Sequence, residues 1–447
     1  MGLPGVVDTL WVAKDTTARG SAESGIVPAL RMRILHVLTA FPRTTDDVIV
    51  PWLVALLKRL QAEGHEVEVF TSAYKGGGNQ SFEGIPVHRF RYFPARWEDL
   101  THDEATPDRM RRSLLYRILP LFYVLGGLWG IRRLTRRCQY DVIHVHWPVP
   151  HALFGWMGQR SSESRPRLVT SWYGVELRWV QSSLPWLRGF VRWALRISDA
   201  IVAISSYTAR EIARFANVPV QVIPYTLPFV EDASKPRERR AGFQVLFVGR
   251  LVERKGVTHL IEAVRRLPAD LGGRLIVIGD GPERAVLEAQ TRAAGIAERV
   301  EIRGRVSDAE LRAAYAASDA LVLPSILDAR GDTEGLGVVL LEAMSYGVPV
   351  VASDIGGITD IVEHDQSGVL VPPGDAAHLA QALERLARDP ALRARLGSAG
   401  AQRVRSAFGW PEIMAKWDAV YRGLAQTRTD TARQAESGAT PPRAPAR

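Results

Sequence analysis

The chain of 447 residues is long enough for two or three domains, and its 46% hydrophobic and 23% charged content is ordinary for a globular protein. Cys138 is the only cysteine, which excludes an internal disulfide framework and a cysteine-built metal site and favours a reducing, cytoplasmic setting. The formal net charge of +9 favours anionic partners. Because helix-turn-helix, zinc-finger and RNA-recognition signatures are absent, we expect no nucleic acid partner.

Short apolar runs alternate with amphipathic helical stretches from residue 32 onward. Residues 1–31 lack this periodicity and the apolar core of a signal peptide, so we expect a disordered extension there. A helix is predicted at 50–64, and buried strands are predicted at 34–38, 66–71, 141–146, 167–171 and 200–204. This rhythm indicates an α/β domain at 32–230 with a doubly wound, mostly parallel sheet.

The polar segment 231–242 is predicted to be a linker, after which the rhythm restarts in a second domain at 243–408. Its strands are predicted at 243–249, 274–279, 300–302, 320–323 and 348–352. Residues 409–425 carry aromatic residues at helical spacing and should form a closing helix that crosses back to the first domain. The Pro-, Ala-, Thr- and Arg-rich tail at 426–447 is expected to be disordered. Two Rossmann-like domains facing a central cleft would place ligands at the carboxyl ends of the strands.

The run EGLGVVLLE places Glu334 and Glu342 on either side of two glycines. Gly335 and Gly337 let the backbone approach a ligand, and a helix is predicted to begin at Val338. A helix start offers unpaired N–H groups and a partial positive charge, which suit a phosphate or diphosphate. The carboxylates could then hold two polyols flanking that diphosphate, as in a nucleotide sugar. For the isolated stretch, a helix-terminal acid plus a solvated glutamate stays the alternative.

The run VGRLVERKG adds two cations at the end of the first strand of the second domain. Gly249 ends that strand, so Arg250 and Lys255 are expected to project into the cleft. Two fixed cations there could neutralise a diphosphate leaving group without a metal. Taken alone, the run is better interpreted as a solvated basic loop, and the cluster with Glu334 and Glu342 is what favours a binding site.

With the further runs VIGDGP, IRGRV, LPS and GVPVVAS and the pair Gly356-Gly357, this half resembles the nucleotide-sugar-binding domain of the family-four retaining glycosyltransferases. The signatures fall in family order across residues 243–375. The resemblance implies the GT-B fold, donor-sugar hydroxyls bound by Glu334, ribose bound by Glu342, a diphosphate beside the cations and a base at the end of the IRGRV strand. The donor-binding residues implied in this way are Gly249, Arg250, Lys255, Arg305, Val306, Glu334, Gly335, Leu336, Gly337 and Glu342.

The first half carries the strand DVIHVHW, in which His144 and His146 share one face. Such a pair could bind a metal, but no third ligand stands nearby in the sequence and the family needs none, so we expect no metal or other cofactor. His144 is then a structural strand histidine. The resemblance implies that His146 lies beside the anomeric region of the donor sugar and polarises it, acting with Glu334, Arg250 and Lys255.

Two runs depart from the family pattern. Many relatives have Gly-Gly where this chain has FPRTTDD at 41–47, and many have His-Gly where it has Tyr173-Gly174. Because these runs belong to the first domain, they affect the acceptor side, for which Tyr173, Glu176 and Arg43 are the candidate residues.

An uncharged run at 118–131 is bracketed by arginines. It is too short for a comfortable membrane span and contains Pro120 and Gly126-Gly127. A buried helix with arginines at its ends and an amphipathic surface docking on an anionic membrane both remain open. A second stretch, 172–196, interleaves tryptophans with arginines and suits either a membrane interface or a sugar face.

These observations predict a metal-independent, retaining hexosyl transferase that moves a sugar from a nucleoside diphosphate to a glycan or lipid-linked acceptor, in cell-surface polysaccharide or glycolipid synthesis. The expected partners are a nucleotide sugar, that acceptor and, peripherally, the cytoplasmic face of a membrane. The alternatives are a GT-B-like sugar-nucleotide epimerase or phosphorylase, and a non-catalytic nucleotide-sugar-binding protein.

Overall fold

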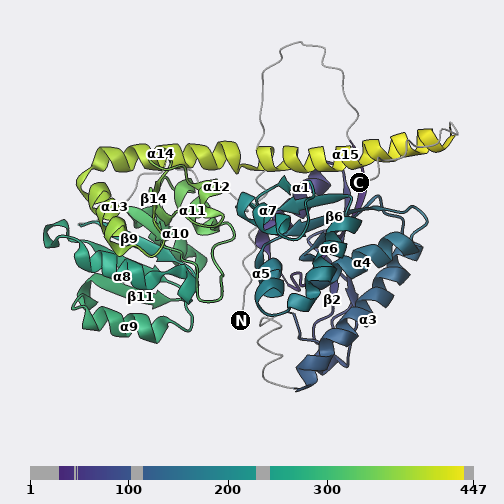
Figure 1. The fold of residues 1–447 in the computed structure, drawn as a ribbon, viewed down its shortest axis with the longest axis horizontal. Coiled ribbons are helices and arrows are strands. Elements are labelled where there is room, and N and C mark those ends of the chain that lie inside the picture. The colour runs from purple at the N-terminus through teal and green to yellow at the C-terminus, as the bar shows by residue number, and fades with distance from the viewer. Residues whose placement is uncertain (1–29, 45–46, 48, 102–113, 228–241, 437–447) are drawn as a thin grey trace, which may run out of the picture.

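The computed structural model describes residues 30–44, 47, 49–101, 114–227 and 242–436, which form two α/β bodies joined along one edge by two long helices (Figure 1). The predicted extension at 1–31 and linker at 231–242 lie almost entirely outside the described residues. The domain limits of 32–230 and 243–408 therefore stay predictions, whereas the arrangement of two sheet-based bodies is confirmed.

The first body contains an eight-stranded sheet in the order β3-β4-β2-β1-β5-β6-β7-β8, in which only the β3–β4 pair is antiparallel. The strands are β1 (Arg33–Val37), β2 (Glu66–Ser72), β3 (Gln80–Phe82), β4 (Ile85–Phe90), β5 (Val142–His146), β6 (Arg167–Trp172), β7 (Ala200–Ala203) and β8 (Gln221–Val222). Sequence reasoning missed β3, β4 and β8, because two of them are only two or three residues long and β4 has polar and apolar residues mixed with a proline.

Helices cover both faces of this sheet, as its almost continuously buried strands require. The helices are α1 (Pro51–Ala62), α3 (Leu114–Arg137), α4 (Pro148–Ser161), α5 (Val175–Ser182), α6 (Arg188–Ile197) and α7 (Ser206–Ala213), with short 3-10 turns η1 (Ala95–Trp97) and η2 (Pro185–Leu187). On one face α3 and α4 pack together over the apolar side chains of β1, β4 and β5, so the run at 118–131 belongs to a helix of the first body.

The second body contains a six-stranded, fully parallel sheet in the order β11-β10-β9-β12-β13-β14. Its strands are β9 (Gln244–Val248), β10 (Arg274–Ile278), β11 (Val300–Gly304), β12 (Ala320–Leu323), β13 (Val350–Ser353) and β14 (Val369–Val371). Its helices are α8 (Val257–Arg266), α9 (Arg284–Ala293), α10 (Asp308–Ala317), α11 (Val338–Ser345), α12 (Ile358–Ile361), α13 (Ala376–Arg388) and α14 (Pro390–Ala407), with 3-10 turns η3 (Glu253–Lys255), η4 (Ala269–Leu271) and η5 (Ala297–Arg299). The predicted doubly wound architecture is confirmed in both halves.

The closing helix α15 (Trp410–Glu436) follows α14 and crosses back over the first body (Figure 1). Its apolar residues, among them Trp417 and Tyr421, pack into the core formed by α1 and the adjoining sheet. The helix was predicted to end at 425, with a disordered tail from 426, but it continues to Glu436. Residues 424–436 contain neither glycine nor proline, so nothing in the sequence stops the helix there.

Side chains of the two bodies bind one another across the cleft. Asp360 accepts hydrogen bonds from the backbone N–H of Ser206 (2.6 Å) and from its hydroxyl (2.5 Å), and so caps the start of α7. Arg178 forms an ion pair with Asp332 at 2.5 Å. Through these contacts, the carboxyl ends of the parallel strands in the two bodies face each other.

Candidate functional site

The segment between β12 and α11 carries Glu334 and approaches the backbone that follows β13 very closely. A Cβ atom on Gly356 would lie 2.2 Å from the carbonyl oxygen of Glu334, and one on Gly357 would lie 2.1 Å from that of Gly335. The N–H of Gly357 donates to the Glu334 carbonyl at 3.0 Å. Only glycines permit this approach, so the Gly356-Gly357 pair fixes the position of the Glu334 segment.

Lys255 is brought to Glu334 by a similar close approach. A Cβ on Gly256, which has φ of 63°, would lie 2.0 Å from the carbonyl oxygen of Pro324 at the end of β12. The preceding turn η3 is thereby fixed beside the chain that leaves β12, where the N–H of Ile326 also donates to the carbonyl of Arg254 at 2.8 Å. Lys255 Nζ donates to Glu334 Oε2 at 2.5 Å, and Arg254 Nη1 donates to the same oxygen at 3.3 Å.

Glu334 is held as a carboxylate by these neighbours. Burial by itself would raise its pKa, but the positive charges of Lys255 and Arg254 outweigh burial and lower it. The carboxylate therefore stays ionised near neutral pH, with its Oε2 oriented by two cations. The structure thus brings together two of the predicted site residues, Glu334 and Lys255, and adds Arg254.

The first body faces this cluster with four aromatic side chains, which we call the aromatic wall: Trp52, Trp147, Tyr173 and Tyr225. Trp147 stacks on Tyr173 with ring centroids 4.3 Å apart, and Trp52 stacks on Tyr225 at 4.9 Å. A cavity lies between the wall and the second body, where it is lined by Arg254 and by residues 333–336. Aromatic rings opposite a carboxylate and cations are a suitable setting for a sugar ring.

A second cavity adjoins the first and shares Trp52 and Tyr225 with it. Glu342 lies in this cavity, and the hydroxyl of Tyr315 donates a hydrogen bond to its Oε2. Burial raises the pKa of Glu342, an effect that the hydrogen bond from Tyr315 opposes. The two glutamates of the EGLGVVLLE run thus line two neighbouring cavities, and their roles toward a sugar and a ribose stay predictions.

Most of the remaining predicted donor residues lie outside the linings of these two cavities. Arg250 is exposed after Gly249 at the end of β9, and Arg305 is exposed after β11. Val306 is partly buried against the core of the second body. Gly337 has φ of 94° and starts α11, and Leu336 is buried beside it. Six of the predicted donor residues, all within the described part of the chain, do not line either cavity: Gly249, Arg250, Lys255, Arg305, Val306 and Gly337.

His146 is fully buried at the end of β5 and does not line either cavity. Its Nδ1 forms a hydrogen bond with the hydroxyl of Tyr173 at 2.8 Å, and its Nε2 with Nδ1 of His36 at 3.0 Å. Burial lowers the pKa of His146 to about 3, so its ring is neutral. His146 is connected to the cavity of Glu334 through its hydrogen bond to Tyr173, which lines that cavity.

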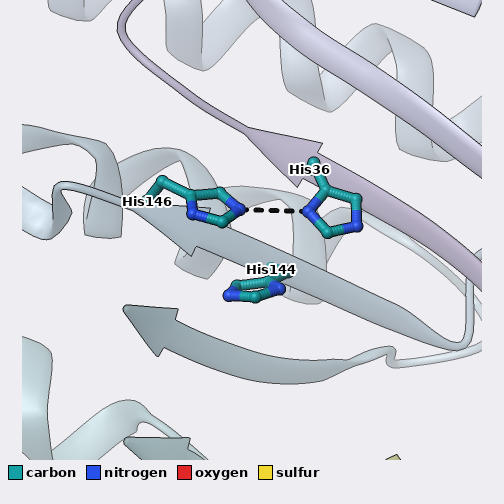
Figure 2. A group of neighbouring side chains, drawn as sticks. All are labelled: His36, His144 and His146. Atoms are coloured by element: carbon teal, nitrogen blue, oxygen red, sulfur yellow. Dashed lines mark hydrogen bonds between the residues drawn. The ribbon is translucent and has the colours of Figure 1, made fainter. Parts of the chain in front are cut away.

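The structure corrects the expectation that no third ligand lies near His144 and His146. His36 lies on β1 directly opposite His144 on β5, and the three rings form one buried group whose ligand atoms lie within 4.8 Å of one another (Figure 2). The sequence hid this neighbour because 110 residues separate His36 from His146.

The arrangement of the three rings nevertheless favours a hydrogen-bonded core over a metal centre. The rings of His144 and His146 are stacked, with centroids 4.2 Å apart and an interplanar angle of 24°, so their in-plane lone pairs run side by side rather than converge. His144 binds Tyr421 of α15 at 3.1 Å and Ser171 at 2.8 Å. The expected structural role of His144 therefore includes anchoring the closing helix.

The candidate acceptor-side residues have different surroundings. Tyr173 lines the cavity, whereas Glu176 is buried behind it and accepts a hydrogen bond from the Tyr173 backbone N–H at 2.8 Å. Burial raises the pKa of Glu176 to about 7. Arg43 pairs with Asp47 at 2.6 Å and lies over the ring of Tyr74, and it lines neither cavity.

Sequence reasoning missed most of the aromatic wall. Both tryptophans lie where a helix begins with proline, next to a residue with left-handed backbone. Trp52 stands two residues after Val50, which has φ of 47°, and Trp147 itself has φ of 51°. The dipeptides Pro51-Trp52 and Trp147-Pro148 at predicted strand and helix ends were the available signal. Arg254 and Tyr315, also missed, had no local signal because their partners are distant in the sequence.

Two family models match the chain. That described as glycosyl transferases group 1 matches residues 230–403, and that described as glycosyltransferase family 4 matches residues 52–226. The chain is 30% identical over 377 residues to the GDP-mannose-dependent alpha-(1-6)-phosphatidylinositol monomannoside mannosyltransferase of Mycobacterium tuberculosis, with 78% of this chain and 95% of the relative covered.

Solved structures share the fold. Sucrose-phosphate synthase from Thermosynechococcus elongatus superposes with a TM-score of 0.66 at 22% identity, covering 89% of this chain and 100% of the other. Anabaena HepE in complex with UDP-glucose superposes with a TM-score of 0.60 at 21% identity, with the same coverage. The chain belongs to the group 1, family 4 glycosyltransferases, and it is a glycosyltransferase with the GT-B fold.

Proposed function

We propose that this glycosyltransferase moves a hexosyl group from a nucleoside diphosphate sugar to a glycan or lipid-linked acceptor with retention of anomeric configuration. The observation that carries the proposal is the cluster of Glu334, Lys255 and Arg254 facing the aromatic wall. A carboxylate held between two cations can accept sugar hydroxyls while the cations bind an adjacent diphosphate. Two similar proteins support a nucleotide-sugar donor: the mannosyltransferase of M. tuberculosis is GDP-mannose-dependent by its name, and Anabaena HepE was solved in complex with UDP-glucose.

The two adjoining cavities suit the two ends of such a donor. The sugar would occupy the cavity of Glu334, where residues 335–337 present the backbone amides that precede α11. The ribose would lie in the cavity of Glu342, whose carboxylate Tyr315 orients. Arg250 and Lys255 would bind the diphosphate between them, and the base would lie toward Arg305 and Val306.

In the proposed reaction the acceptor hydroxyl attacks the anomeric carbon from the face that the diphosphate leaves. The bond from the anomeric carbon to the diphosphate oxygen breaks, the bond to the acceptor oxygen forms, and the acceptor proton passes to the departing diphosphate. Lys255, Arg250 and the amides at 335–337 stabilise the charge that develops on the phosphate. Glu334 orients the sugar ring, and His146 acts on it through Tyr173.

No metal is needed in this proposal, because fixed cations take the role of a Lewis acid at the leaving group. The hydrogen bond from Lys255 to Glu334 supports this role, because it fixes the ammonium group beside the cavity that Glu334 lines. Transfer should therefore proceed undiminished in the presence of EDTA, and complete loss of activity would contradict the proposed leaving-group chemistry.

The acceptor is proposed to be a growing polysaccharide or a lipid-linked sugar, bound on the side of Tyr173, Glu176 and Arg43. The relative from M. tuberculosis acts, by its name, on a phosphatidylinositol mannoside. The excess of positive charge in the chain favours an anionic lipid or glycan. A cytoplasmic setting with peripheral attachment to the membrane belongs to the same proposal, supported by the single cysteine.

A thermal-shift screen with UDP-, GDP- and ADP-sugars tests the donor assignment, with Glu334→Gln as the matched variant. One class of donor should raise the melting temperature of the wild-type protein. Proton NMR of the product formed on a lipid-linked or oligosaccharide acceptor should then show the anomeric configuration of the donor. A sugar changed in the absence of acceptor would favour an epimerase, donor binding without turnover would favour a non-catalytic protein, and absorbance of a lysine-bound pyridoxal group would favour a phosphorylase.

A further inference from the structure

The inner face of α3 is fixed against the first body by three glycines. A Cβ on Gly127 would lie 2.2 Å from the ring of Phe154 in α4, one on Gly126 would lie 2.6 Å from the carbonyl oxygen of Arg91, and one on Gly130 would lie 2.9 Å from Cβ of Phe90. Such close contact along one side leaves the helix no freedom to rotate about its axis. The opposite side of α3 therefore faces away from the first body, toward solvent.

That outward side is apolar from Ile118 to Trp129, which is half of the helix. Five large apolar side chains, each between 39% and 64% exposed, form what we call the α3 stripe: Ile118, Leu121, Phe122, Leu125 and Trp129. At 3.6 residues per turn they fall within about 60° of one line and extend for about 17 Å. Five large apolar side chains on one continuous line differ from the single exposed apolar residues found on any protein surface.

The same face becomes basic after Trp129. Arg132, Arg133 and Arg136 continue the line, and Arg137 lies beside them; all four are exposed. Helix α3 contains no acidic residue, and no carboxylate among the described residues lies within 4.0 Å of these four guanidinium groups. Arg133 lies over the ring of Trp129, with 5.4 Å between its Cζ and the ring centroid. The face is therefore an apolar stripe that ends in a cluster of positive charge.

We propose that the outward face of α3 docks the protein on an anionic lipid bilayer, with the α3 stripe in the interfacial region and the arginines on lipid phosphates. Tryptophan and arginine are the residues that suit this depth, and a positively charged rim selects a negatively charged surface. A second copy of the chain would place the two arginine clusters against like charge or leave them unpaired. None of the helices in the described part of the chain has the length and apolarity needed to span a bilayer, so the helix lies along the surface.

The position of α3 agrees with this orientation. It lies at the outer edge of the first body, away from the second body (Figure 1). The cleft and its cavities contain no residue of α3. Docking through α3 therefore leaves the donor cavities open, and it does not depend on the proposed donor chemistry.

Co-sedimentation of the full chain with lipid vesicles tests the proposal. Vesicles of phosphatidylcholine with 30% phosphatidylglycerol should bind the wild-type protein, and vesicles of phosphatidylcholine alone should bind it much more weakly. The variant R132E/R136E should lower binding to the anionic vesicles by about tenfold or more, since each basic residue near such a surface contributes about 1 kcal/mol. L125S/W129S should lose binding as well.

Matched controls separate the α3 face from general charge and apolar exposure. R292E/R405E changes the net charge equally at exposed positions of α9 and α14 and should bind within about twofold of wild type. Val286→Ser removes an exposed apolar side chain of α9 and should bind as wild type does. Melting temperatures within a few degrees of wild type show that each variant is folded.

Failure of the wild-type protein to bind anionic vesicles would overturn the proposal. Equal loss of binding in R132E/R136E and R292E/R405E would overturn it too, because the effect would then follow net charge alone. A dimer in solution that L125S/W129S dissociates, without vesicle binding, would assign the face to a second copy instead.

Discussion

The hydroxyl of Tyr173 lies 2.8 Å from Nδ1 of His146, and this contact joins a fully buried histidine to the wall of the cleft. His146 cannot reach a ligand in this arrangement, because its other nitrogen is bound to His36 at 3.0 Å. The hydroxyl of Tyr173 is therefore directed toward His146, while other atoms of Tyr173 line the cavity. In the proposed mechanism Tyr173 is therefore a positioning residue, through which His146 would act on the sugar.

Tyr173→Phe should lower the melting temperature by several degrees, because it leaves Nδ1 of His146 buried without a partner at a cost of about 1–3 kcal/mol. The measurement is differential scanning fluorimetry on the purified variant. Tyr225→Phe is the matched control. Tyr225 belongs to the same aromatic wall, but its hydroxyl makes no hydrogen bond to a described residue. If both variants melted like wild type, the contact between Tyr173 and His146 would have no structural weight.

Glu334→Gln should lower kcat/KM for transfer by about 100-fold or more, a loss typical of removing one transition-state contact from a preorganised site. The variant keeps the shape of the side chain but removes the charge that orients Lys255 and Arg254. Initial rates at saturating acceptor measure the effect, with Glu412→Gln on the exposed start of α15 as control. Near-normal turnover in the Glu334 variant would refute its assignment to the donor site.

Lys255→Ala should weaken binding of the free nucleoside diphosphate by about 10- to 100-fold, since a charge-assisted hydrogen bond contributes about 1.5–3 kcal/mol. Isothermal titration calorimetry with UDP or GDP measures the change. Arg266→Ala removes one positive charge at the far, exposed end of α8, the helix that follows Lys255, and should leave affinity unchanged. Equal weakening by both variants would point to long-range electrostatics instead of direct contact by Lys255.

The fold was predictable because buried parallel strands are continuous apolar runs and their alternation with helices is regular. The placement of the candidate donor residues was predictable where the motif itself is local, as for Glu334 and Glu342 on either side of the start of α11. The orientation of these residues was not, because it depends on Gly256 and Gly356 meeting backbone atoms of remote segments.

Contacts between residues that lie far apart in the sequence could not be predicted from it. His36 joins His146 across neighbouring strands β1 and β5, and Trp52 meets Tyr225 although 173 positions separate them in the numbering. Two-residue strands such as β8 carry too little pattern to be recognised. The predicted end of α15 was wrong because the composition of 426–447 suggested a disordered tail. Residues 424–436 contain no glycine or proline, and the helix continues through them.

Glu176 gives the chain a pH-dependent stability. Burial raises its pKa from the ordinary 4.5 to about 7 in the folded protein, although hydrogen bonds from the Tyr173 and Glu176 backbone oppose the shift. Below pH 4.5 the group is protonated in both states and costs nothing. As the pH rises from 4.5 to 7, only the unfolded chain releases the proton, so stability falls, by up to about 3 kcal/mol for a difference of this size.

Glu176→Gln should remove this dependence, because the amide oxygen can still accept the hydrogen bond from Tyr173 while carrying no ionisable group. The melting temperature of the variant minus that of wild type should therefore increase between pH 5 and pH 8 and stay level above pH 8. Scanning fluorimetry across that range measures the difference, with Glu163→Gln at an exposed loop position as control. A difference that is constant from pH 5 to pH 8 would mean that Glu176 is ionised throughout, and that the cavity wall behind Tyr173 admits water to its carboxylate.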